Sequence, residues 1–399
     1  MFQKIDAAPG DPILSLMEDF KADPRSEKVN LSIGLYYNGE GFVPQLDCVK
    51  EARQLLDKDT ATPDLYLPME GHAAYRQQVQ RLLFGADSTG VNDGRIATVQ
   101  TVGGSGALKI GADFLKHFYP HAELWVSDPT WENHLSIFEG AGFRTHRYPY
   151  FNAETGLVDL PAMLACLRGV PAQSVVLLHP CCHNPTGADL TKTQWDEVIA
   201  LLKERHLIPF LDMAYQGLGA GLEEDSYAIR AMERAGLTFL VSNSFSKIFS
   251  LYGDRIGALS VMCAHRDDAE RVLSQLKRTV RRNYSSPPVR GAQIVATILS
   301  DERLAQKWRN EVEAMRVRIV AMRQKLVAQL GERVPHYDAR YLTAQRGMFS
   351  YTGLCGEQAD RLCETYGIYI LRSGRVCMAG LNDHTLPRVV EAIAQVLTA

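Results

Sequence analysis

A lysine in the middle of the chain has neighbours that together could do carbonyl chemistry. Lys247 ends the segment Ser242-Asn243-Ser244-Phe245-Ser246-Lys247, and Arg255 follows eight residues later. The apolar run 239–241 predicts a buried strand, so the lysine stands where a strand gives way to a loop. A lysine removed from water there loses proton affinity, and its neutral amine can attack a carbonyl group near neutral pH. The competing interpretation is a solvated lysine in a serine-rich loop.

An acid follows a second apolar run. Asp212 comes directly after 207–211, a stretch typical of strands in parallel sheets. Pyridoxal phosphate needs an amine for its aldehyde, an acid beside its ring nitrogen, and hydroxyl or cationic groups for its phosphate. The chain offers all three, and Tyr215 could donate to the phenolic oxygen of the coenzyme. Taken alone, Asp212 could equally cap a following helix, and Tyr215 could be an ordinary tyrosine at the edge of the core.

A glycine-rich turn is the third element. In Gly103-Gly104-Ser105-Gly106 a predicted strand gives way to a helix that runs on through Leu115. Free N–H groups at such a helix start bind phosphate. The G-x-G-x-x-G dinucleotide motif fails, because Lys109 takes the place of its third glycine, and no G-x-x-x-x-G-K-[ST] motif occurs. Glycines at this kind of turn can also serve conformation alone.

Seven motifs in order make the chain resemble the class I pyridoxal-phosphate aminotransferases of the aspartate and aromatic group, and most of all the bacterial tyrosine (aromatic amino acid) enzymes. The resemblance runs from about Asp11 to the C-terminus. The motifs are Tyr66-Leu67-Pro68, Gly103-Gly104-Ser105-Gly106, His183-Asn184-Pro185-Thr186-Gly187, Asp212-Met213-Ala214-Tyr215, Ser244-Phe245-Ser246-Lys247, Arg281-Arg282-Asn283-Tyr284 and Ser373-Gly374-Arg375.

The resemblance implies an α/β fold of the pyridoxal-phosphate transferase type (fold type I), with a mainly parallel central sheet and a smaller α/β second domain. It implies a homodimer with shared active sites, an N-terminal arm over 1–10, a small domain from 11–45 and 313–399, and a large coenzyme-binding domain over 46–312. The alternation of strand-like runs at 124–126, 174–178, 209–211 and 238–241 with helical patterns such as 194–205 also favours α/β. Apolar positions at helical spacing predict a long domain-linking helix over 301–330 that Gly331 stops.

The resemblance also assigns roles to residues that hold the coenzyme. Lys247 would bind its aldehyde and shuttle the substrate proton, Asp212 would pair with its ring nitrogen, and His134 and His179 would stand beside them. Asn184 and Tyr215 would bond its phenolic oxygen, and Trp131 would stack on the ring. The groups assigned to its phosphate are Gly104, Ser105, Ser244, Ser246 and Arg255, with Tyr66 from the other subunit.

A further set is assigned to the substrate. Arg375 would fork onto its α-carboxylate, and Arg281 of the other subunit would meet the second carboxylate of an acidic substrate. Gly34, which has no side chain, would let the backbone approach the substrate closely. Trp131 and Asn184 would also contact the substrate, and Phe349 would favour substrates with aromatic side chains. Without the resemblance, Arg281 is an ordinary solvated arginine and Arg375 a surface arginine near a strand end. Cis peptide bonds are implied at Asp128-Pro129 and Asn184-Pro185.

The implied reaction is ping-pong, Schiff-base transfer of the amino group of phenylalanine, tyrosine or aspartate to 2-oxoglutarate. The main alternative is an aspartate aminotransferase with secondary aromatic activity, since aspartate enzymes share almost every motif. A pyridoxal-phosphate lyase has less need for two substrate arginines. A nicotinamide dehydrogenase would require the missing glycine motif, and a regulator on this fold would require an added DNA-binding domain.

Composition agrees with a cytoplasmic enzyme. The 399 residues are 46% hydrophobic and carry a net charge of -3. This charge argues against electrostatic binding to nucleic acid or to an anionic membrane. The segment Met1–Asp6 lacks the apolar core of a signal peptide. Eight irregularly spaced cysteines predict no disulfide framework. His179-Pro180-Cys181-Cys182-His183 suits metal chelation poorly, because Pro180 opposes a helix and the cysteines are adjacent, so no metal site is expected.

Overall fold

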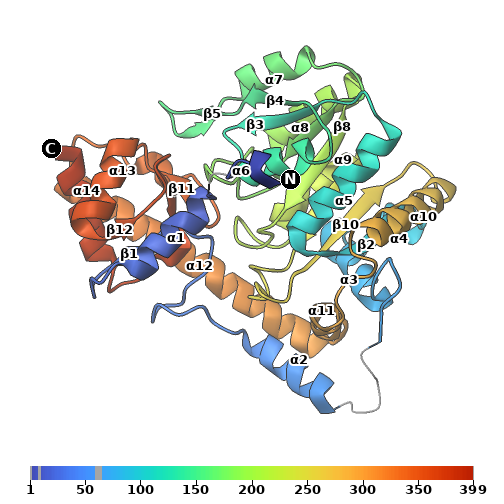
Figure 1. Ribbon diagram of the computed structural model, residues 1–399, viewed down its shortest axis with the longest axis horizontal. Coiled ribbons are helices and arrows are strands. Elements are labelled where there is room, and N and C mark those ends of the chain that lie inside the picture. The colour runs from blue at the N-terminus through green and yellow to red at the C-terminus, as the bar shows by residue number, and fades with distance from the viewer. Residues whose placement is uncertain (1, 8–9, 59–64, 399) are drawn as a thin grey trace.

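The computed structural model describes residues 2–7, 10–58 and 65–398 (Figure 1). Residues 1, 8 and 9 of the expected N-terminal arm lie outside the described residues, and the arm includes the 3-10 turn η1 (Phe2–Lys4). The division into an arm and two domains stays a prediction.

A central sheet carries the fold. Its order is β2 (Ile96–Val102), β10 (Ile256–Met262), β9 (Phe239–Ser244), β8 (Ile208–Met213), β7 (Val175–Leu178), β3 (Leu124–Asp128) and β4 (Thr145–Pro149). The strands from β9 to β4 are parallel to their neighbours, and β10 is antiparallel to both β2 and β9. The predicted α/β class with a mainly parallel sheet is therefore confirmed.

Both faces of this sheet are buried, which explains its near-continuous apolar strands. Along β8, Phe210 packs into one apolar cluster with Leu108, and Leu211 packs into a second cluster with Trp195. Successive strand residues face opposite sides, so each strand feeds both clusters.

The remaining described strands form three two-stranded sheets. They are β1 (Val29–Asn30) with β12 (Ile368–Tyr369), β11 (Phe349–Tyr351) with β13 (Arg375–Cys377), and β5 (Phe151–Asn152) with β6 (Leu157–Val158). The first pair is parallel and the other two are antiparallel.

The α-helices are α1 (Pro12–Ala22), α2 (Asp47–Lys58), α3 (Ala73–Phe84), α4 (Thr89–Asn92), α5 (Gly103–Phe118), α6 (Glu132–Glu139), α7 (Leu160–Arg168), α8 (Lys192–Glu204), α9 (Tyr227–Arg234), α10 (Arg266–Asn283), α11 (Arg290–Ser300), α12 (Glu302–Arg333), α13 (Gly356–Tyr366) and α14 (Leu386–Thr398). Further 3-10 turns are η2 (Glu224–Ser226), η3 (Arg340–Thr343) and η4 (Met378–Gly380). Within the described ranges, no helix has the length and apolarity to cross a membrane. Figure 1 shows α12 running from α11 and α2 to the group formed by α1, α13 and α14.

The long helix differs from the prediction at its end. It does not stop at Gly331 but continues to Arg333. Glycine costs an exposed helix only about 1 kcal/mol, so it does not end a helix by itself. Val334 leaves the helix with φ -131° and ψ 72°, and it precedes Pro335, which disfavours the helical conformation for that residue.

Two strands also run further than expected. β8 includes Asp212 and ends at Met213, and β9 continues through Ser242 to Ser244. The apolar runs used to predict these strands end at 211 and 241, yet the polar residues that follow also pair in the ladder, with Asp212 beside Ser242. Because the sheet supplies partners on both sides, polar side chains are tolerated at its carboxyl end.

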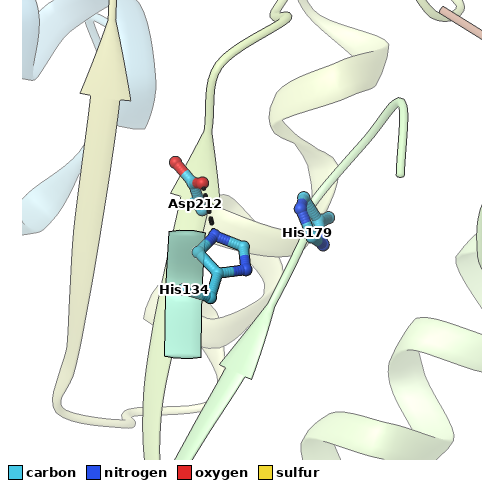
Figure 2. A group of neighbouring side chains, drawn as sticks. All are labelled: His134, His179 and Asp212. Carbon is cyan, nitrogen blue, oxygen red and sulfur yellow. Dashed lines mark hydrogen bonds and ion pairs between the residues drawn. The ribbon is translucent and has the colours of Figure 1, made fainter. Parts of the chain in front are cut away.

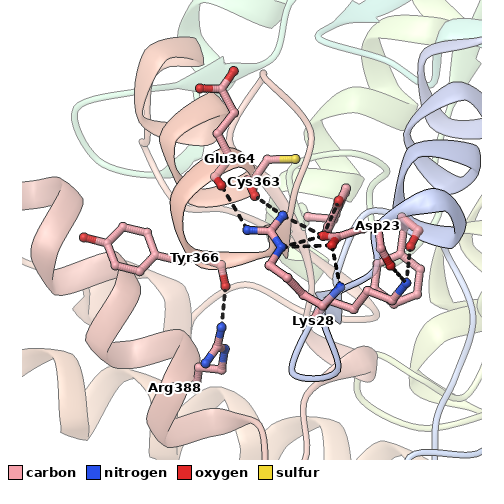
Figure 3. A network of polar contacts seen from close by, with 9 residues as sticks. Asp23, Lys28, Cys363, Glu364, Tyr366 and Arg388 are labelled. Atoms are coloured by element: carbon pink, nitrogen blue, oxygen red, sulfur yellow. Dashed lines mark hydrogen bonds and ion pairs between the residues drawn. The ribbon is translucent and has the colours of Figure 1, made fainter.

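A polar network ties the segment after α1 to α13 (Figure 3). Arg25 donates to the carbonyls of Cys363 and Glu364, both at 2.9 Å, and Arg388 donates to that of Tyr366 at 2.8 Å. These are carbonyls of the last helical turn, where backbone donors run out, although the Cys363 carbonyl also accepts from the Gly367 N–H at 3.1 Å. Asp23 orients Arg25 through Nε at 2.8 Å. Residues near the two ends of the chain are thereby joined.

Candidate active site

A cavity of about 250 Å³ opens at the carboxyl ends of the parallel strands, the usual place for ligands in such sheets. It is reached by the ends of β8 and β9, the start of α5, the loops after β3 and β7, and segments from both ends of the chain. Fourteen residues expected at the site line it: Gly34, Gly104, Ser105, Trp131, His179, Asn184, Asp212, Tyr215, Ser244, Ser246, Lys247, Arg255, Phe349 and Arg375.

Lys247 lies three residues beyond β9, with its Nζ 5.2 Å from the centroid of the Tyr215 ring. Burial lowers the pKa of this amine to about 8, helped by Arg255 and Arg375 and opposed by Asp212. A pKa near 8 leaves roughly a tenth of the amine neutral at pH 7. Lys247 can therefore act as a nucleophile and as a base without a separate activating group.

Asp212 is buried in β8, and both of its oxygens accept hydrogen bonds, of which Figure 2 shows the one from His134. His134 Nε2 donates to Oδ2 at 2.9 Å, and Ser242 Oγ donates to Oδ1 at 3.3 Å. Burial by itself would raise the pKa of Asp212, but the hydrogen bond from His134 and the charges nearby outweigh it and lower the pKa. The carboxylate therefore stays ionised, as it must to hold a proton on a facing ring nitrogen.

Two further groups define the surroundings of this carboxylate. His134 Nδ1 lies 2.9 Å from Thr130 Oγ1, so both ring nitrogens of His134 are engaged. Burial lowers the pKa of His179 to about 3, and its ring centroid is 5.2 Å from that of His134. Ligand atoms of His134, His179 and Asp212 lie within 4.8 Å of one another, but the bonds of His134 leave it no free nitrogen for a metal.

A cup of hydroxyl, amide and guanidinium groups forms the next wall. Ser244 Oγ donates to Ser246 Oγ at 3.2 Å, and Arg255 Nη1 donates to Ser246 Oγ at 3.4 Å. The helix α5 starts at Gly103 without a side-chain cap among the described residues. The Gly103 N–H donates to Arg255 O at 3.0 Å, and the next two residues of the first turn, Gly104 and Ser105, line the cavity. A Cβ on Gly104 would lie 3.2 Å from Ser244 Cβ, so a side chain would narrow the cup. This donor set suits a phosphate.

Arg375 forms another wall of the cavity and is 3% exposed. Its Nη1 donates to Asn184 Oδ1 at 3.2 Å and its Nη2 to Ser32 O at 2.5 Å. In the part of the chain that the structure describes, its Nε is buried without a partner and no carboxylate pairs with it. Burial lowers its pKa. An unpaired buried guanidinium is costly, and a substrate carboxylate would compensate it.

Phe349 closes this wall. The Arg375 guanidinium lies 4.2 Å from its ring centroid, and the Tyr215 ring centroid is 6.0 Å away. A Cβ on Gly34 would come within 2.8 Å of Phe349 Cζ, so the ring leaves no room for a side chain there.

The family model for aminotransferase class I and II matches residues 26–393. This chain belongs to the class I and II aminotransferases. It is 61% identical over 397 residues to the aromatic-amino-acid aminotransferase of Escherichia coli K12 and 59% identical to the tyrosine aminotransferase of Klebsiella pneumoniae, with 100% of both chains covered in each case. The crystal structure of the Burkholderia pseudomallei aromatic-amino-acid aminotransferase, covalently bound to pyridoxal phosphate, superposes with a TM-score of 0.97 at 49% identity, covering 100% of this chain and 99% of that one.

Two predicted residues of this aminotransferase stay away from the cavity of their own chain. Tyr66 is 96% exposed. Arg281 lies in the last turn of α10, is exposed, and donates to Ser285 Oγ. Neither lines the cavity, which leaves their expected place in a partner's site a prediction.

Three residues at the cavity were not identified from the sequence. Ile13 on α1 and Ala214 after β8 line the cavity, and Ser242 bonds Asp212. Strand alternation could have identified Ser242, because it shares a face of β9 with Ser244. Ile13 gave no signal, since only the tertiary fold brings α1 to the cavity. The predicted cis bonds at Asp128-Pro129 and Asn184-Pro185 are confirmed.

Proposed function

We propose that this aminotransferase moves the amino group of phenylalanine and tyrosine, and of aspartate, to 2-oxoglutarate with the help of pyridoxal phosphate. The observation that carries the proposal is the placing of Lys247 in one cavity with the ionised Asp212 and the unpaired, buried Arg375. Amino transfer from an amino acid requires a base, a carboxylate that keeps the coenzyme ring nitrogen protonated, and a guanidinium group that binds the substrate carboxylate. The names of the bacterial relatives support the aromatic substrates.

The residues present fit the coenzyme. The cup of Ser105, Ser244, Ser246 and Arg255 would hold its phosphate, Asp212 its ring nitrogen, and Asn184 and Tyr215 its phenolic oxygen, with Trp131 along the ring. When bound, the coenzyme supplies an electron sink for the bond that breaks at the substrate α-carbon.

The protein's own groups do the rest. Arg375 holds the substrate α-carboxylate and so fixes the α-carbon near Lys247. The Lys247 amine would take the α-proton there and pass it to the coenzyme, and in the second half of the reaction it would carry a proton the opposite way, to the α-carbon of the 2-oxo acid. Asp212 stays ionised throughout, because His134 and Ser242 donate to it. The apolar wall of Ile13 and Phe349 accepts an aromatic side chain and excludes water.

The proposal includes a homodimer in the cytoplasm with shared active sites. Tyr66 and Arg281 are exposed in one chain and would complete the site of the partner, Tyr66 at the coenzyme phosphate and Arg281 at the second carboxylate of an acidic substrate. The domain assignment, with 46–312 as the large domain and 11–45 and 313–399 as the small one, belongs to the same proposal.

An aspartate aminotransferase with secondary aromatic activity is the second candidate, and Arg281 is the residue that favours it. A substrate competition separates the two. We expect 15N to pass from labelled phenylalanine to glutamate in the presence of 2-oxoglutarate, with kcat/KM for phenylalanine and tyrosine at least equal to that for aspartate. A clear preference for aspartate would select the second candidate. Release of labelled ammonia instead of labelled glutamate would contradict amino transfer and indicate a lyase.

A further inference from the structure

A second cavity, of about 270 Å³, lies between α12 and the segment that leads into β11. Three arginines line it, Arg316 and Arg323 from α12 and Arg346 from the segment before β11. Among the described residues that line it, none is acidic, and none is shared with the active cavity. Its lining is therefore strongly biased toward positive charge.

Arg323 is the most unusual of the three, because it is only 2% exposed. Its Nη2 donates to Gly347 O at 2.7 Å and its Nε to Ser350 Oγ at 3.3 Å. These neutral partners leave its charge uncompensated, and burial lowers its pKa to about 10. Within the described residues, Nη1 of Arg323 has no hydrogen-bond partner, and this atom is accessible to solvent. A donor is thus left for a ligand.

The other lining groups leave room for an anion. Glu313 pairs with Arg316, whereas Arg346 is exposed and forms no ion pair in the ranges that the structure covers. Gln345, 1% exposed, donates to Gly156 O at 3.0 Å, and its Oε1 has no partner among the described atoms. Two guanidinium groups without counterions thus share one cavity, whereas the buried Oε1 of Gln345 is an acceptor and gives an anion no bond.

Two buried acids whose pKa values respond to Arg346, Asp189 and Asp225, form no ion pair with these arginines in the described part of the chain. Asp189 accepts from the N–H groups of Cys182 and His183, and Asp225 accepts from those of Gly217, Gly219 and Ala220. Burial raises the pKa of both carboxyl groups, while Arg346 lowers it slightly in each case. Both acids are engaged by backbone, so they contribute long-range charge but no ion pair to the cavity.

We propose that this cavity is a binding site for a small oxyanion, a phosphate or carboxylate group held between Arg323 and Arg346. Planar guanidinium groups recognise both anions through paired N–H donors, and a buried site strengthens such bonds. The site is separate from the phosphate cup around Arg255. It adjoins the backbone that carries Phe349, because Arg323 also donates to Phe349 O at 3.5 Å.

The test is calorimetric titration of the coenzyme-loaded enzyme at low ionic strength, with inorganic phosphate in one arm and succinate in the other. We expect a saturable phosphate event that Arg346→Gln weakens at least tenfold. The matched control is Arg340→Gln, since Arg340 lies in the same segment, is 86% exposed and pairs with Asp338 outside the cavity. An Arg346-dependent event with succinate alone would identify a carboxylate as the ligand. Absence of any Arg346-dependent event in both arms would overturn the proposal.

Hydrogen exchange locates the ligand independently of the variants. On adding the anion that binds, we expect slower exchange of the backbone amides in 343–349 and 219–220. Protection confined to the phosphate cup or to the surroundings of Arg375 would place the anion in the active cavity and overturn the proposal. Because Arg346 is exposed, its substitution should leave the thermal midpoint unchanged, so a loss of binding would not reflect unfolding.

Discussion

The proton affinity of Lys247 is set by its surroundings, and this makes it measurable in the protein without coenzyme. Its pKa lies near 8 because burial disfavours the charged amine. Below that pH the amine is mostly protonated, so the rate at which the apoprotein captures pyridoxal phosphate should fall about tenfold per pH unit, and above it the rate should level off. Stopped-flow absorbance gives this profile. A flat profile between pH 6 and 9 would contradict the assigned pKa.

Lys247 also serves as the base, so its removal should be far more costly than that of any neighbour. In Lys247→Ala we expect turnover to fall by several orders of magnitude, on the order of 7 kcal/mol in the barrier. Added small primary amines should restore part of the rate, since they can take the proton in the vacated space. A variant with near-normal single-turnover rates would show that another group is the base.

Asp212 depends on its two hydrogen-bond donors. Asp212→Asn removes the negative charge at nearly constant size, so the electron sink weakens and α-proton removal should slow about a thousandfold, roughly 4 kcal/mol. A deuterated α-carbon should then give a large isotope effect on single turnover. His134→Gln keeps the carboxylate and should cost much less. An isotope effect near one in Asp212→Asn would mean that its slow step lies elsewhere.

For single residues, the sequence predicted the reactive groups better than the hydrogen bonds that hold them in place. Lys247, Asp212 and the serines could be found because strand ends are where catalytic groups gather, and the resemblance supplied Asn184, Trp131 and Arg375. The donors to Asp212 could not be fixed in the same way. Ser242 follows the apolar run 239–241 and was given no role, and Thr130, which supports His134, becomes visible only once the loop after β3 is folded.

Among the elements, α12 and α13 end in different ways, and their glycines provide a matched pair. Gly331 lies inside α12 with ordinary helical backbone, and a Cβ there would meet no described atom within 4 Å. Gly331→Ala should therefore stabilise the protein by about 1 kcal/mol.

Gly367 is the contrasting position. It ends α13 at φ 69°, a left-handed conformation that costs other residues about 1–2 kcal/mol, so Gly367→Ala should destabilise the protein by a similar amount. Urea unfolding of both variants compares them directly. Equal signs for the two changes would contradict the helix ends described here.

The elements themselves were largely predictable, and their ends were not. Apolar runs located β7, β8 and β9, and periodicity located α8 and α12. Gly331 was misinterpreted because glycine signals a helix end only when the chain also needs a left-handed residue there. The polar ends of β8 and β9 were missed because pairing within a sheet overrides the loop preference of Ser and Asn.

For the whole molecule, the proposed shared site has a sharp consequence. Lys247→Ala lacks the base and Arg281→Ala lacks the partner for the side-chain carboxylate of aspartate, so neither homodimer should transaminate aspartate well. Refolded together, each mixed dimer contains one doubly altered site and one intact site, and random pairing should restore about a quarter of the wild-type aspartate activity. Arg281→Ala alone should still accept phenylalanine.

The deciding result is the aspartate activity of confirmed mixed dimers. If these dimers transaminate phenylalanine but not aspartate, Arg281 lies outside the partner's site. The sequence could suggest this arrangement only through family resemblance. The fold of one chain leaves Tyr66 and Arg281 at the surface, and no local pattern distinguishes a residue that serves another subunit from one that faces water.

The most direct test of the central claim is to find which amine binds the coenzyme. The loaded enzyme is reduced with borohydride, digested, and analysed by mass spectrometry for the peptide that carries the pyridoxyl phosphate mass. We expect that mass on Lys247, near one equivalent per chain, and no stable label in Lys247→Ala. A label on another lysine, or equal labelling of the variant, would contradict the account of this cavity as the site of amino transfer.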